Sequence, residues 1–123
     1  MSSRPEVNDE AYLWDMRENA ILVNAIVDSA TYDEFLPGSM LRLAVERAIE
    51  IIGEAAGHVT TGMRVRSPDI PWRQIVGLRN VLVHEYGQID PVRLWYTATH
   101  DMIPLINTID SLLPRGQMPR QDQ

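Results

Sequence analysis

The sequence predicts an all-α protein, an antiparallel up-and-down bundle of four main helices. Apolar residues recur at intervals of three and four along four separate stretches, which is the periodicity of amphipathic helices. The connections between these stretches are short, and none shows the alternation typical of a half-buried strand. With 123 residues the chain is expected to form one domain, at residues 8–113, between flexible tails at 1–7 and 114–123.

The first helix is expected to begin at Asn8, because asparagine is a good N-cap residue. Its main apolar stripe consists of Leu13, Met16, Ala20, Val23 and Val27. A second stripe, on another side, consists of Trp14, Ile21 and Ala25. A helix that is apolar on two sides needs two neighbours, and one of them could be a partner chain.

The second helix is expected over residues 40–56. Gly53 lies inside it, where glycine costs about 1 kcal/mol relative to alanine, and we interpret it as a point of close approach by the third helix. Glu54 follows directly and is therefore a candidate partner for a cation on that helix. The alternative is a solvated face on which Glu50 and Glu54 lie beside Arg47, with an intrahelical pair.

The third helix is predicted to run from a cap at Asp69 to Gly87, a residue type that often ends helices in the left-handed conformation. On a wheel of about 100° per residue, Arg79 falls within its apolar arc. A guanidinium there is costly unless it is paired, so Arg79 either meets a carboxylate such as Glu54 or lines a cleft. His84 lies about 140° from Arg79 on an ideal helix. Both therefore reach one substrate only if the helix unwinds near His84, or if the site is a groove between two chains.

Two further segments complete the chain. Residues 57–68 are interpreted as a loop, in which Arg64 and Arg66 either help to hold RNA or are simply solvated. The last helix is expected over residues 90–114, with a kink at Pro104, because proline cannot donate a backbone hydrogen bond.

The composition argues against several classes of function. The net charge of −6 argues against broad, sequence-independent nucleic-acid binding, which depends on basic surface. All 11 basic residues are arginine, which reflects either genomic composition or selection for bidentate phosphate contacts. The absence of cysteine excludes disulfides and thiolate metal sites and agrees with a cytoplasmic location. No apolar run approaches the ~20 residues of a membrane span.

Arg79, His84 and Tyr86 are spaced as Arg-x4-His-x-Tyr, which resembles the R-x-x-x-x-H-x-Y motif of the HepT-like toxins, a branch of the HEPN ribonuclease superfamily. The preceding Ile-Pro-Trp-Arg-Gln-Ile-Val-Gly-Leu-Arg-Asn from residue 70, and Ile-Ile-Gly-Glu-Ala-Ala from residue 51, are also similar to that family. An Arg-x4-His pair alone arises by chance, but joined to these segments it is specific. The resemblance implies a helical bundle that commonly dimerises.

The motif residues suit metal-independent cleavage of RNA. No metal-ligand cluster, glycine-rich phosphate loop or Gly-x-Ser-x-Gly elbow occurs in the sequence, and no cofactor is expected. Histidine titrates near neutral pH, so His84 could act as general acid/base toward a ribose 2′-OH. Arg79 could clamp the phosphate, with Asn80 as a further polar contact. The structural alternative pairs Arg79 with Glu54 and makes His84 an ordinary helix-end histidine.

The resemblance also implies partners. The chain is expected to be the toxin of a toxin–antitoxin pair, with RNA as substrate, a second copy in a homodimer, and a minimal nucleotidyltransferase as antitoxin. That enzyme would add AMP to the motif tyrosine, here Tyr86, and the added charge would compete with RNA for Arg79. Alternatively, Tyr86 only packs its ring on the apolar arc shared with Arg79. A second alternative for the whole chain is a non-catalytic nucleotide- or protein-binding partner of a nucleotidyltransferase.

Overall fold

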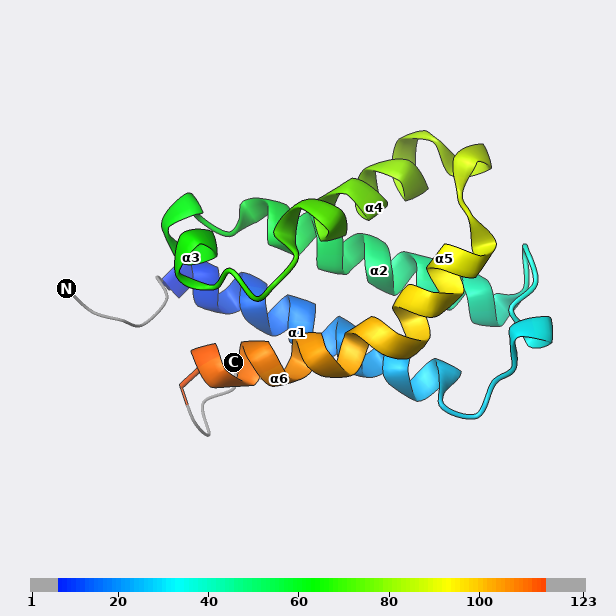
Figure 1. Ribbon diagram of the computed structural model, residues 1–123, viewed down its shortest axis with the longest axis horizontal. Coiled ribbons are helices and arrows are strands. Elements are labelled where there is room, and N and C mark those ends of the chain that lie inside the picture. The colour runs from blue at the N-terminus through cyan, green and yellow to red at the C-terminus, as the bar shows by residue number, and fades with distance from the viewer. Residues whose placement is uncertain (1–6, 115–123) are drawn as a thin grey trace, which may run out of the picture.

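The computed structural model describes residues 7–114, and every regular element in this range is helical. The helices are α1 (Val7–Val27), α2 (Met40–His58), α3 (Thr61–Arg66), α4 (Trp72–His84), α5 (Pro91–Tyr96) and α6 (Met102–Leu112). The structure also contains 3-10 turns at Tyr32–Glu34 and Tyr86–Gln88 and a π turn at Thr97–Asp101. Successive long helices run in opposite directions, and α5, the π turn and α6 form one continuous, bent rod (Figure 1). The predicted all-α antiparallel bundle is confirmed.

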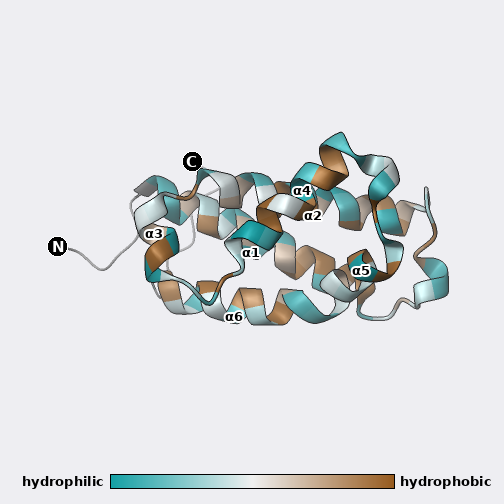
Figure 2. Ribbon diagram, turned by 45° about the horizontal axis from the view of Figure 1, so that its top comes forward, coloured by the Kyte–Doolittle hydropathy of each residue, from teal (hydrophilic) through white to brown (hydrophobic). Residues whose placement is uncertain are grey.

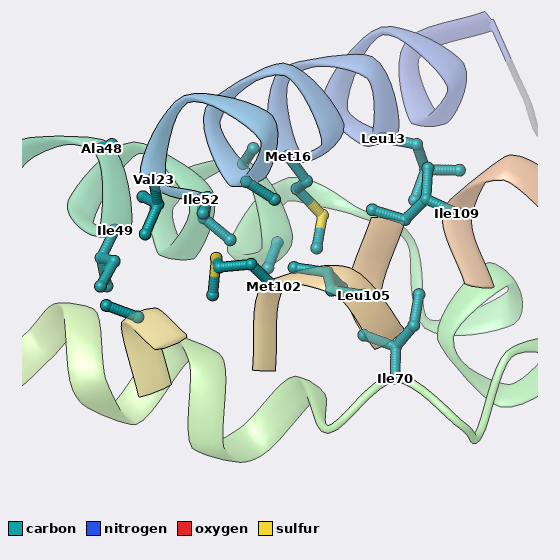
Figure 3. Packing of buried hydrophobic residues seen from close by; sticks show 14 of the residues in the cluster. Leu13, Met16, Val23, Ala48, Ile49, Ile52, Ile70, Met102, Leu105 and Ile109 are labelled. Atoms are coloured by element: carbon teal, nitrogen blue, oxygen red, sulfur yellow. The ribbon is translucent and has the colours of Figure 1, made fainter. Parts of the chain in front are cut away.

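The core lies where α1, α2 and α6 meet (Figure 3). Helix α1 packs on α2 and on α6, and α4 packs on the far side of α2. The main α1 stripe predicted from the sequence is buried throughout. The second stripe is divided, because Trp14 is buried whereas Ile21 and Ala25 are exposed. Hydrophobic and hydrophilic bands alternate along the long helices, as expected for amphipathic elements (Figure 2).

A short helix, α3, lies in the segment 57–68 that was predicted to be a loop. The Thr60 hydroxyl caps it by accepting the Met63 N–H at 3.3 Å. The Asp9 carboxylate of α1 in turn accepts hydrogen bonds from the Thr60 N–H at 2.9 Å and the Thr60 hydroxyl at 2.7 Å. The prediction missed α3 because its start is fixed by a residue 51 positions away in the sequence.

Helix α4 begins later than predicted, at Trp72 rather than just after Asp69. The Trp72 indole N–H donates to the Ser67 carbonyl at 3.0 Å, which holds residues 67–71 as a separate turn. Pro71 therefore occupies the N-cap position, and Asp69 does not cap the helix.

The end of α4 also differs from the prediction. The last helical residue is His84, and Glu85 leaves the helical region with φ −135° and ψ 46°. Gly87 lies in the following 3-10 turn and does not adopt a left-handed conformation. The helix thus unwinds directly after His84. Because His84 is itself still helical, its angle of about 140° from Arg79 is kept, and this exit does not by itself bring the two side chains to one substrate.

The last predicted helix divides into α5, the π turn and α6. The π turn lies just before Pro104, in the region whose hydrogen bonding the proline disrupts, since proline cannot donate to the His100 carbonyl. The predicted disturbance at Pro104 therefore takes the form of a widened turn. The predicted tails fall outside the described residues, except for Val7, which begins α1, and Pro114. Within residues 7–114, no helix combines the length and apolarity needed to cross a lipid bilayer.

Candidate active site

Arg79 is held where α4 comes closest to α2. A Cβ atom on Gly53 would overlap the Arg79 Cβ and would lie 2.9 Å from its Cγ and 3.0 Å from the Ile75 carbonyl oxygen. Only glycine therefore permits this packing, and the close approach predicted at Gly53 is confirmed. The stem of Arg79 is pressed against the α2 backbone, and the side chain is half-buried.

The expected ion pair between Arg79 and Glu54 is not formed. Glu54 is exposed, and none of the ion pairs among residues 7–114 joins it to Arg79. The reason is geometric: Glu54 follows the contact residue Gly53 and so points about 100° away around α2. The alternative, a solvated face, describes this part of α2 better, because the Arg47 guanidinium pairs with Glu50 at 3.1 Å.

The Arg79 guanidinium turns instead toward Asn80. Its Nη1 donates to the Asn80 Oδ1 at 3.2 Å. On the helix, Asn80 lies only about 40° from His84, whereas Arg79 lies about 140° from it. The bond to Asn80 therefore draws the guanidinium around α4 toward the side that carries His84. His84 is exposed, and its ring has no hydrogen bond or ion pair within the described part of the chain.

The side of α4 that carries His84 continues along the helix. Arg73, Gly77, Asn80 and His84 fall within an arc of about 60°, and we call them the α4 stripe. A hollow of 520 Å³ lies beside α3 and is lined in part by Arg73, Gly77 and Asn80. Arg73 is exposed and has no hydrogen-bond or ion-pair partner among residues 7–114. The sequence prediction did not single out Arg73, although its spacing of 11 residues from His84 was a usable signal.

Arg64 also lines this hollow, but its guanidinium is engaged elsewhere. Its Nε donates to the Val59 carbonyl at 3.1 Å, and its Nη2 donates to the Ala56 and Gly57 carbonyls at 3.0 Å each. These acceptors are carbonyls at the C-terminal end of α2, which a cation there stabilises. The Arg64 guanidinium thus caps the end of α2, a structural role that neither of the two alternatives for Arg64 had included.

Tyr86 reaches α2 rather than the apolar arc of α4. The chain leaves the helix at Glu85, so helical periodicity no longer fixes the direction of the Tyr86 ring. The phenol is half exposed, and its hydroxyl donates to Glu46 at 3.0 Å from Oε1 and 3.1 Å from Oε2. Partial desolvation of the hydroxyl, together with the bond to the Glu46 carboxylate, raises the pKa of Tyr86 above its ordinary value.

Glu46 belongs to a buried ion pair that the sequence prediction missed. Its carboxylate accepts a hydrogen bond from Arg42 Nε at 2.8 Å, and the two residues are 4% and 5% exposed. The Arg42 guanidinium also lies over the Phe35 ring, 5.4 Å from its centroid, and its Nη1 is buried without a hydrogen-bond partner. The sequence could have indicated this pair, because helical spacing places Arg42 and Glu46 on the same side of α2 as the core residue Ile49.

A larger hollow, of 610 Å³, lies on another side of α4, between α4 and the α5–α6 rod. Apolar side chains such as Ile52, Leu78 and Leu105 make up most of its lining, with Asp69, Asp101 and Arg93 among the polar residues. Neither Arg79 nor His84 lines it. Within residues 7–114, no three histidine, aspartate or glutamate side chains converge as ligands for a metal ion.

Comparison with known proteins gives consistent matches. Residues 16–112 match the family described as "Ribonuclease HepT-like". The chain is 41% identical over 93 residues to the protein named "Putative RNase MJ1380" of Methanocaldococcus jannaschii, covering 76% of this chain and 85% of that protein. It is 33% identical over 101 residues to "Probable ribonuclease HepT" of Thermococcus cleftensis, covering 82% of this chain and 92% of that protein. No solved structure matches the chain.

Proposed function

The chain belongs to the HepT-like ribonuclease family, and we propose that it is a metal-independent endoribonuclease, the toxin of a cytoplasmic toxin–antitoxin pair, that acts through Arg79 and His84. The observation that carries the proposal is the hydrogen bond from Arg79 to Asn80. It directs a permanently charged guanidinium toward the side of α4 where the exposed His84 ring lies. A phosphate and the hydroxyl that attacks it could meet there.

The proposed chemistry uses the Arg79 and His84 side chains and no metal ion. The His84 ring takes the proton from a ribose 2′-OH, and the 2′ oxygen attacks the adjacent phosphorus as the 5′ oxygen leaves with a proton. Arg79 binds the phosphate through its N–H groups and offsets the negative charge that grows on the phosphate oxygens. Asn80 keeps the guanidinium in place. Arg73, about 16 Å from His84 along the axis of α4, would hold a flanking phosphate of the same strand.

A homodimer is part of the proposal, because one histidine cannot accept the first proton and donate the second at the same moment. A second copy across a two-fold axis would supply the second His84. Exposed apolar side chains support such an interface, namely Val83 at the end of α4 (43% exposed) and Leu22 on α1 (47% exposed). Light scattering tests this step, and a stable monomer at micromolar concentration would remove it.

The antitoxin proposal concerns Tyr86. By the family resemblance, a minimal nucleotidyltransferase would bond the Tyr86 oxygen to the α-phosphorus of ATP, with pyrophosphate as the leaving group. The half-exposed ring supports access by such an enzyme. Mass spectrometry after co-expression with the neighbouring gene tests it, and an unmodified Tyr86 in a neutralised chain would leave steric masking instead.

The ribonuclease proposal is tested by cleavage of single-stranded RNA by the purified chain in EDTA. Wild type is expected to cleave, and His84→Ala and Arg79→Ala are each expected to lose about 100-fold or more in kcat. Arg73→Gln, which removes only the flanking contact, should raise KM more than it lowers kcat. Cleavage that disappears in EDTA, or that survives in both alanine variants, would overturn the mechanism and favour a non-catalytic partner of a nucleotidyltransferase.

A further inference from the structure

Among residues 7–114, one side-chain hydrogen bond joins the turn after α4 to another helix. The turn Tyr86–Gln88 contains no buried residue, and its backbone hydrogen bonds are local. The connection to α2 is the bond from the Tyr86 hydroxyl to Glu46. The buried Leu82 anchors α4 two residues before His84, and a contact that fixes the turn restrains the chain on the other side of the His84 ring.

The acceptor of that bond is itself held rigidly. Glu46 is 4% exposed, and the Arg42 Nε bond at 2.8 Å orients its carboxylate within α2. Arg42 is fixed in turn by its position over the Phe35 ring. A buried ion pair is weak evidence for stability, because well-packed apolar residues of similar size often serve as well. Its place beside an exposed turn, with the carboxylate bonded to Tyr86, therefore points to a role in positioning rather than in the core alone.

We propose that Glu46, oriented by Arg42, is a positioning residue of the ribonuclease site, which acts through Tyr86 to hold the end of α4 and the His84 ring in place. This inference rests on the proposed function for its catalytic consequence, but its structural part stands on the Tyr86–Glu46 contact. The contact requires the hydrogen of the phenol, since Glu46 as a carboxylate can only accept. Tyr86 must therefore be an unmodified phenol for the turn to stay docked.

The same geometry gives a second route by which modification of Tyr86 would silence the enzyme. Any group bonded to the Tyr86 oxygen replaces the donated hydrogen. A phosphoryl group would also bring negative charge against the buried Glu46 carboxylate. The turn would then leave α2, and His84 would lose its position, whether or not the added group competes with RNA for Arg79.

The test uses two ways of breaking the contact. Tyr86→Phe removes the donor alone, and the double variant Arg42→Met/Glu46→Leu replaces the ion pair by apolar side chains that should preserve folding. Each is expected to lower kcat about 10-fold with little change in KM, and to lower amide-exchange protection at residues 86–89 by a similar factor. Combining the two changes should add little, because they break one contact. Glu46→Gln, which keeps an acceptor oxygen, should retain more activity than Glu46→Ala.

Glu50→Gln is the matched control, because it removes the same charge from α2 without touching a hydrogen bond to Tyr86. It should leave exchange at residues 86–89 unchanged. Unchanged exchange in Tyr86→Phe, or effects of the two variants that multiply, would overturn the proposal. Should wild type not cleave RNA, the proposed function fails by itself, and amide exchange still decides whether Glu46 holds the turn.

Discussion

Glu46 and Glu54 lie on the same helix and have opposite surroundings. Glu46 is buried and contacts Arg42 and Tyr86, whereas Glu54 is exposed and takes part in none of the ion pairs among the described residues. The difference follows from the antiparallel packing of α2 and α4. At Gly53 the two backbones are too close for a carboxylate to fit between them. Glu46 is seven residues earlier in α2, opposite Tyr86, which is seven residues after Arg79, where the chain has left the helix.

The comparison teaches that a charged side chain finds a partner across a helix pair where the pair opens, and not where it is tightest. Arg79 starts at the tightest point, so its guanidinium extends out of the contact to Asn80. Tyr86 starts beyond the contact, so its hydroxyl can reach back to α2. The substitutions below test this contrast.

The largest effect is expected from Arg42→Ala. This change leaves the Glu46 carboxylate buried without its cation, which should lower the free energy of unfolding by about 3–5 kcal/mol. Glu54→Ala, on the exposed side of the same helix, should change it by less than about 0.5 kcal/mol. Urea unfolding of both variants measures the difference. Equal losses would show that the buried pair contributes no more than a surface charge.

The sequence predicted the packing better than the ends of the elements. Glycine inside an amphipathic stretch was enough to predict the contact at Gly53, because few other roles justify glycine there. The predicted end of α4 was wrong. Gly87 is a typical helix terminator, but the chain leaves the helix earlier, at Glu85, where Tyr86 forms its hydrogen bond to Glu46 on another helix. The predicted ion pair between Arg79 and Glu54 was wrong because Glu54 is one residue beyond the contact at Gly53. One residue along a helix turns a side chain by about 100°.

The motif residues could be identified from the sequence, but the residues of α2 that contact the motif could not. Arg79, Asn80 and His84 come from one continuous segment, so their spacing could be read directly. Arg42 and Glu46 lie 40 or more residues from Tyr86, and only the packing of α4 on α2 brings them together. The roles of Arg79, His84 and Tyr86 stay predictions until the variants are measured.

A smaller effect is expected from Gly53→Ala, which tests the tight end of the comparison. The added methyl group would overlap Arg79, so α4 must move outward, at a cost of about 1–3 kcal/mol in the free energy of unfolding. Gly57→Ala is the matched control, because a Cβ at Gly57 meets nothing within 4 Å and alanine favours the helix. The midpoint temperature of thermal unfolding should therefore fall for Gly53→Ala and stay level or rise for Gly57→Ala. A Gly53→Ala variant as stable as wild type would mean that the two helices are not locked at this point.

The smallest expected effect is on the pH at which Tyr86 ionises, and it tests the Tyr86–Glu46 contact, where α2 and α4 are farther apart than at Gly53. The folded protein raises the pKa of Tyr86 above that of an ordinary phenol, which is about 10. Desolvation and the Glu46 bond cause the rise, Glu50 adds to it, and Arg42 opposes it. Since the folded state holds the phenolic proton more tightly than the unfolded state, this contribution to stability is complete below about pH 10 and is lost as the pH rises through the folded pKa. Difference titration at 295 nm between wild type and Tyr86→Phe should therefore reveal a tyrosine that ionises above pH 10. The same difference measured in a Glu46→Gln background should move back toward the ordinary value, because the neutral amide no longer disfavours the phenolate. A midpoint at or below 10 in the first pair would contradict the contact, since a phenol that donates to a carboxylate cannot ionise more easily than one in water.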